Sequence, residues 1–156
     1  MGFQMHFGLI VLLAFVSNLV FCYDITKTDI KIVTNETRYT TLHPNATYRA
    51  FGKVAHAKGN IIFTSGERID GDRLILSFID ENQFARLVDI EVSLWYPEVG
   101  HDGLIISCVE FVTDLSTSDA DVYFVNGGGV GDTYAEMLMV ANHTYNFGYQ
   151  IFMYGY

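Results

Sequence analysis

Apolar and polar residues alternate with a period of two along much of this chain, and this pattern constrains the fold more than any other feature. The segment Leu87 to Trp95 reads LVDIEVSLW, and a second alternating segment runs from Phe147 to Tyr154. Successive side chains of a strand point to opposite faces, so both segments predict half-buried β-strands. The side chains expected to lie together in the core are Val88, Ile90, Val92 and Leu94 from the first segment and Phe147, Tyr149, Ile151 and Met153 from the second.

Further strands are predicted at residues 74–79, 104–113, 121–125 and 133–141, where β-branched and aromatic residues are prominent. Turn-forming residues separate them, and no convincing amphipathic helix appears after the first 22 residues. The pattern predicts an all-β domain over residues 48–156, folded as an antiparallel β-sandwich or flattened barrel of about seven to nine strands. Residues 23–47 are polar and rich in threonine, and they are predicted to form an extended leader with at most an edge strand.

The N-terminal stretch has the pattern of a signal peptide. Phe7 to Val16 is an uninterrupted apolar run of ten residues, shorter than the ~20 needed to span a membrane. Small residues at Val20 and Cys22 place the expected cut before Tyr23, so residues 1–22 are predicted to be a signal-peptide helix. The mature protein is then expected to be secreted and extracellular, without a membrane segment. An uncleaved anchor and a lipid-attached Cys22 are the alternatives.

Charge is distributed unevenly along the chain. Residues 87–156 contain 10 acidic residues and no lysine or arginine. Nucleic-acid binding depends on basic side chains that release counterions from phosphates, so we expect no nucleic-acid partner. An anionic membrane surface is disfavoured for the same reason. A basic protein partner, or solubility alone, is consistent with this charge.

The residues that carry chemistry elsewhere do not form a recognisable catalytic or metal-binding motif here. Gly127, Gly128, Gly129 and Gly131 are followed by Asp132 rather than lysine, which favours a glycine turn with positive φ over a phosphate-binding loop. The histidines lack metal-ligand spacing, and no cofactor is expected. We therefore expect no enzymatic activity, and a hydrolase that uses His101 is the alternative. Cys108 lies in an apolar run and is expected to be a buried thiol, with an intermolecular disulfide as the alternative.

Three segments match the acceptor pattern for N-linked glycosylation. They begin at Asn35, Asn45 and Asn142. Behind a signal peptide, three such segments predict a glycoprotein in which each site lies at the surface.

The C-terminal third contains three segments that together form a recognisable pattern. They are residues 125–134 (VNGGGVGDTY), the Asn146-Phe147 pair and the closing segment 151–155 (IFMYG). This combination resembles the insect multiprotein bridging factor 2 family, which includes the REPAT (response to pathogen) proteins. Residues 71–73 and 109–114 are also similar, so the resemblance covers roughly residues 71–155. Members of the family usually carry arginine or lysine just before the Asn-Phe pair, where this chain has residues 140–144 (VANHT), which contain the acceptor segment at Asn142.

The resemblance implies a small, secreted, non-enzymatic protein of gut, saliva or haemolymph that responds to pathogens, toxins or stress by binding a protein partner. The family's name implies a different role, that of a transcriptional co-activator that bridges a nuclear receptor to general factors. The signal-like segment and the three acceptor sites favour the secreted role. Aromatic residues between Tyr145 and Tyr156 are a candidate partner surface, with ordinary core as the alternative.

Overall fold

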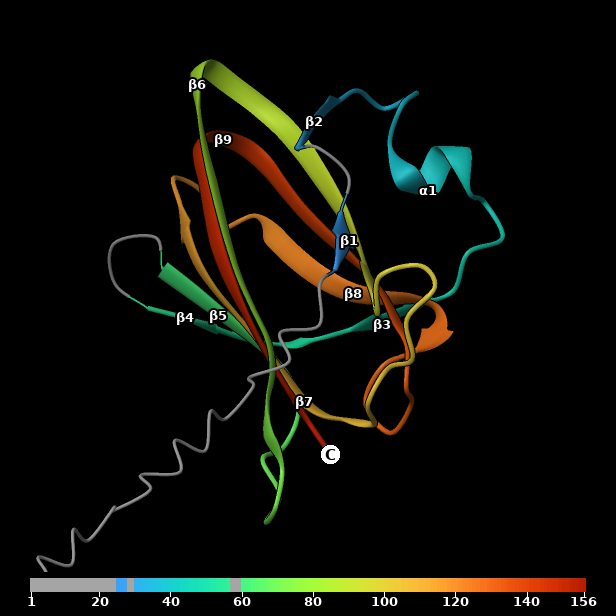
Figure 1. Cartoon of the computed structure of the whole chain (residues 1–156). Helices are drawn as coiled ribbons and strands as arrows, with labels where there is room; N and C mark the ends of the chain where they lie inside the picture. The colour runs from blue at the N-terminus through green and yellow to red at the C-terminus, as the bar shows by residue number, and fades with distance from the viewer. Residues whose placement is uncertain (1–24, 28–29, 57–59) are drawn as a thin grey trace, which may run out of the picture.

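The computed structural model describes residues 25–27, 30–56 and 60–156 (Figure 1). The described residues form nine strands and one short helix. These are β1 (Thr26–Lys27), β2 (Lys31–Val33), α1 (Tyr39–Leu42), β3 (Tyr48–Ala50), β4 (Gly52–Ala55), β5 (Asn60–Gly66), β6 (Arg73–Tyr96), β7 (Ile106–Leu115), β8 (Ala120–Gly128) and β9 (Ala135–Gly155).

All strand pairs are antiparallel, and the strands form one continuous open sheet. Its main order is β1-β6-β9-β7-β5-β4; β2 also pairs with β6, and β8 pairs with both β9 and β3. The prediction of an all-β antiparallel fold is therefore confirmed. The strands join in one sheet, where a sandwich would have two separate ones.

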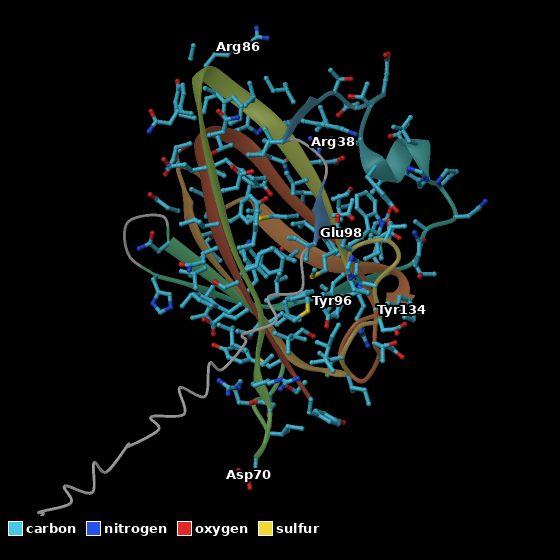
Figure 2. The ribbon with its side chains drawn as sticks, viewed as in Figure 1. Arg38, Asp70, Arg86, Tyr96, Glu98 and Tyr134 are labelled. Atoms are coloured by element: carbon cyan, nitrogen blue, oxygen red, sulfur yellow. The ribbon has the colours of Figure 1, made fainter. Side chains whose placement is uncertain are left out.

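The two longest strands give the sheet its shape because each of them bends into two arms. In β6 the pairing register with β9 shifts between Gln83 and Val88, and in β9 the bend includes His143, whose φ is 52°. Figure 1 shows both strands rising to a turn and descending again, and Arg86 lies at the tip of the β6 bend in Figure 2. The first arm of β9 pairs with β8, and its second arm pairs with β7. One sheet thus has two halves, which share β6 and β9.

The core lies between these halves. The eight side chains predicted from the two alternating segments are all buried in one cluster, which confirms that prediction. Phe51, between β3 and β4, joins the halves: its ring lies 5.7 Å from that of Phe111 on β7 and 4.5 Å from that of Phe124 on β8. Cys108 is buried as expected, and its burial raises the pKa of the thiol.

The glycine-rich turn between β8 and β9 has the backbone conformation that its sequence requires. Gly127, Gly128, Gly129 and Gly131 all have positive φ. A methyl group at Gly129 would lie 2.5 Å from the Arg49 guanidinium and 2.9 Å from the Phe124 ring, so the side chains packed here leave no room for one. The turn therefore seals one end of the core.

The leader is more structured than its composition indicates. It contributes β1 and β2 to the sheet through pairing with the second arm of β6, and α1 follows them. The predicted signal peptide, residues 1–22, lies outside the described residues. Within the described ranges, no helix is long and apolar enough to cross a membrane.

Candidate functional site

A pocket of about 200 Å³ lies where the N-terminal segment crosses the outer face of the sheet. Its walls come from β2, α1, β6 and β9, and they combine aromatic and acidic side chains. The lining residues are Lys31, Val33, Thr37, Tyr39, Leu42, His43, Glu91, Ser93, Trp95 and Glu136.

Strand register explains why these side chains meet. Glu91, Ser93 and Trp95 alternate with the core residues of β6, so they occupy the opposite, outer face. Trp95 pairs with Glu136 on β9, and Lys31 on β2 pairs with Glu91. The same alternation that builds the core therefore gathers two carboxylates and an indole on the outside.

Both carboxylates are held in place by hydrogen bonds from the leader and the glycine turn. Glu136 accepts from the Tyr39 hydroxyl at 2.8 Å and from Asn126 Nδ2 at 2.9 Å. Glu91 is only 7% exposed and accepts the backbone N–H of Tyr39 at 2.7 Å. The Glu91 carboxylate also lies 4.0 Å from the Arg38 guanidinium. These contacts fix the positions of both carboxylates in the wall of the pocket.

The electrostatic character of the pocket is visible in Tyr39, which lines it, and in the neighbouring Tyr48. Burial, together with the hydrogen bond to Glu136, raises the pKa of Tyr39 to about 12. Burial and the charges of Glu91 and Glu136 raise the pKa of Tyr48, whose ring meets that of Tyr39 edge-on at 6.3 Å. The His43 ring lies 4.3 Å from the Tyr39 ring. Carboxylates beside aromatic rings favour an organic cation, such as a lysine or arginine side chain.

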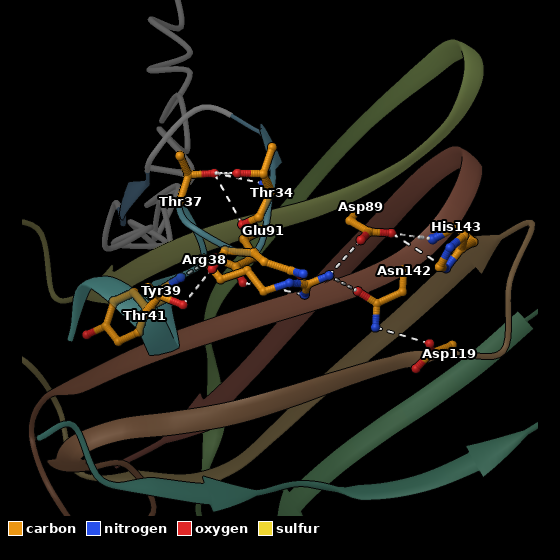
Figure 3. Close-up of polar contacts among 11 residues, drawn as sticks. Thr34, Thr37, Arg38, Tyr39, Thr41, Asp89, Glu91, Asp119, Asn142 and His143 are labelled. Carbon is orange, nitrogen blue, oxygen red and sulfur yellow. Dashed lines mark hydrogen bonds and ion pairs between the residues drawn. The ribbon is translucent and has the colours of Figure 1, made fainter. Parts of the chain in front are cut away.

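Arg38 fastens the N-terminal segment to the sheet, as Figure 3 shows. Its Nη2 atom donates to Asp89 Oδ2 at 2.6 Å and to Asn142 Oδ1 at 2.9 Å. Asp89 also accepts the backbone N–H of His143, and Asn142 Nδ2 donates to Asp119 at 3.1 Å. The leader is thus tied to the bend of β9 as well as to the pocket.

This network separates the three glycosylation candidates. Asn35 and Asn45 are exposed, as a surface glycan requires. The amide of Asn142 is engaged on both sides, by Arg38 and by Asp119, and Thr144 of the same acceptor segment is buried. Asn142 therefore contacts Arg38 without lining the pocket, whereas Thr37 of the Asn35 acceptor segment lines it.

The other candidates from the sequence lie away from this pocket. His101 is in an exposed turn, where its backbone N–H donates to the Glu98 carbonyl. In the part of the chain that the structure describes, no three histidine, cysteine, aspartate or glutamate side chains could together hold a metal ion. The proposed partner surface at Tyr145 to Tyr156 is mostly core: alternate residues are buried, and Tyr145 and Tyr156 are its large exposed aromatics.

Sequence reasoning missed the pocket residues Tyr39, Glu91 and Glu136. The only signal for two of them was their place on the polar face of alternating strands, which any solvated strand shares. Tyr39 reaches Glu136 across a separation of 97 positions, which no local pattern could reveal.

Comparison with known proteins supports one family. Neither the curated proteins nor the solved structures gave a match. The family model described as Transcription activator MBF2 matches residues 65–155, which is more than half of the chain and includes the glycine turn and all of β9. The resemblance seen in the sequence is confirmed, and the chain belongs to the MBF2 family.

Proposed function

We propose that this protein acts by binding a protein partner through a basic side chain, which enters the pocket between α1 and the sheet. The observation that carries the proposal is the arrangement of Glu91 and Glu136 around Tyr39 and Trp95. A cation there gains two charge-assisted contacts and an aromatic surface.

The family description favours a role in transcription activation for this binding. On this proposal the partner is a component of the transcription machinery, and the chain acts as a co-activator through protein contact. The acidic second half of the chain supports contact with a protein more than contact with DNA.

A second candidate is the secreted, stress-responsive binding protein, favoured by the apolar run of residues 7–16 and by the exposure of Asn35 and Asn45. Expression of the full chain in insect cells separates the two. A chain in the medium that begins at Tyr23 and loses mass on glycan removal supports secretion. A full-length, unmodified chain in the nucleus supports the co-activator. The exposed turn around His101 lends no support to a hydrolase.

Binding itself can be measured through Trp95, the single tryptophan of the chain, which lines the pocket. Titration with N-acetyl-lysine methylamide or its arginine analogue is expected to change the Trp95 fluorescence, and the glutamate analogue is expected to leave it unchanged. Glu136→Gln removes one charge with little change of shape and should weaken the response. A matched control is Glu98→Gln, which lies in the turn after β6. Equal responses to the lysine and glutamate probes would overturn the proposal.

A further inference from the structure

The first arm of β6 forms a long open edge of the sheet. Residues 73–83 pair with β9 on one side, whereas β1 and β2 pair only with residues 89–95 of the second arm. Among the described residues, no strand covers the other side of the first arm. An open edge offers unpaired backbone donors and acceptors, and an extended peptide can add to it as a further strand.

Two backbone donors lie in this arm. The N–H of Glu81 donates to Asp80 Oδ1, and the N–H of Gln83 donates to Asn82 Oδ1, both at 3.0 Å. Residues two apart in a strand present their N–H groups on the same side, so both groups lie on one side of β6. Each group donates to the side chain of the preceding residue, and carbonyl oxygens of an added strand would replace these short-range contacts.

A pocket of about 260 Å³ adjoins this edge and includes residues 79–83 of β6 in its wall. Gly148 of β9 lies on its floor between neighbouring strands. A methyl group at Gly148 would lie 3.7 Å from Asp114 Cβ and 3.8 Å from Glu81 Cβ, so these two acidic side chains flank the hollow that the glycine leaves.

The pocket also contains unmet hydrogen-bonding capacity. Asn146 Oδ1, on the same face of β9 as Gly148, is buried without a hydrogen-bond partner. The side chain of Tyr149 points into the core on the opposite face. Buried polar atoms normally have a partner. Carboxylates and an amide oxygen accept hydrogen bonds, and the described lining residues include no lysine or arginine. The pocket is therefore suited to a ligand that donates N–H groups and carries positive charge.

We propose that the first arm of β6 accepts an added strand from a basic partner protein, with a lysine or arginine of that strand in the pocket above Gly148. The open backbone supplies affinity for any extended segment, and the pocket selects the basic side chain. This surface is separate from the pocket beneath α1 and stands independently of the function proposed for it.

Nuclear magnetic resonance of the ¹⁵N-labelled protein tests the proposal. The probes are acetyl-Thr-Val-Thr-Val-Lys-Val-Thr-Val-amide and the same peptide with glutamate in place of lysine. The lysine peptide is expected to shift the amide signals of Ile79 to Gln83 and of Gly148, and the glutamate peptide is expected to bind at least about tenfold more weakly.

Two variants address the pocket and the edge in turn. Gly148→Val fills the hollow at ordinary contact distances and adds a residue that favours strands. It should weaken binding of the lysine peptide about tenfold, while the free energy of unfolding of the protein stays equal or rises. Ile79→Lys, at a side chain 70% exposed, places positive charge on the edge and should weaken the same peptide. Val99→Lys, at an 85% exposed position in the turn after β6, should leave binding unchanged.

Several results would overturn this inference. They are equal binding of both peptides, unchanged binding by Gly148→Val, absence of binding by the lysine peptide, and signal shifts confined to the α1 pocket. A change in Trp95 fluorescence without shifts at Ile79 to Gln83 would support the α1 pocket and reject the β6 edge, so the two proposals fail separately.

Discussion

Replacing Phe51 with alanine is expected to destabilise the entire domain, because this ring packs against both halves of the sheet. The side chain is only 7% exposed, and removing a buried phenylalanine ring costs about 3–5 kcal/mol. Its contacts with Phe111 and Phe124 contribute about 0.5–1.5 kcal/mol each within that total. Domains have a total stability of about 5–15 kcal/mol, so the variant should lose a large share of it.

Urea unfolding measures this loss with two independent signals, the fluorescence of Trp95 and the far-ultraviolet circular dichroism of the sheet. Both signals should move to lower urea together, because the halves share β6 and β9. Val54→Ala is the matched control on the neighbouring β4, where the side chain is exposed and the expected change is within about 0.5 kcal/mol. If Phe51→Ala changed stability no more than this control, the ring would not join the halves.

Four further predictions follow from contacts in the leader, the turns and the core. Arg38→Met should lower the free energy of unfolding, measured in urea, by about 1–2 kcal/mol, because Asp89 and Asn142 lose a charged donor. If Arg38 and Asp89 are coupled, the same substitution should cost less in a protein that already carries Asp89→Asn. Additive effects of the two substitutions would refute the coupling. The Arg68 guanidinium beside Asp72 holds the pKa of that carboxyl well below its usual range. The stability that this pair contributes is present above pH ~4, the pKa of the Asp72 carboxyl in the unfolded chain, and is lost as pH falls through its lower pKa in the folded protein. Asp72→Asn should therefore reduce the loss of stability at acid pH. An unchanged loss at acid pH would contradict this reasoning. Cys108 should react with a maleimide only when the protein is unfolded, since burial protects the thiol and raises its pKa; rapid labelling of the native protein would show otherwise. If the chain is secreted, Asn35→Gln and Asn45→Gln should each reduce the glycan mass, and Asn142→Gln should not, because its amide is engaged by Arg38 and Asp119.

The core could be predicted from sequence because its signal is local. Val92 and Ile151 belong to alternating runs in which every second residue is apolar, and a strand with one face buried requires that pattern. The turn at Gly129 could also be predicted from the sequence. A positive φ and close packing at this position allow few residue types other than glycine.

The bends in β6 and β9 could not be predicted in the same way. The sequence predicted separate strands over residues 74–79 and 87–95, and residues 80–83 between them are polar. In the structure the backbone stays extended through most of this stretch and remains in one strand, because β9 bends with it and keeps the pairing on both sides of the corner. Exposure at a corner of a sheet and exposure in a loop select the same residues, so composition does not distinguish them.

The candidate site depends even more on distant contacts. Arg38 meets Asp89 across 51 positions and Asn142 across 104, and these contacts bring the leader onto the sheet. The threonine-rich composition of the leader indicated an extended chain. This composition does not identify Arg38 as the residue that anchors the leader to the sheet.

The position of β9 in the sheet also determines when the protein can fold. β9 pairs with β6, β7 and β8, yet it follows all three in the sequence. As the chain leaves the ribosome, those three strands emerge with their apolar faces and backbone groups exposed, because β9, the strand that pairs with all three, has not yet been synthesised. The sheet can therefore assemble only after residues 135–155 have been synthesised, and a translation product that stops short of them has no core to form. A chaperone that holds β6 to β8 until then would protect the chain during the interval in which it is most prone to aggregate.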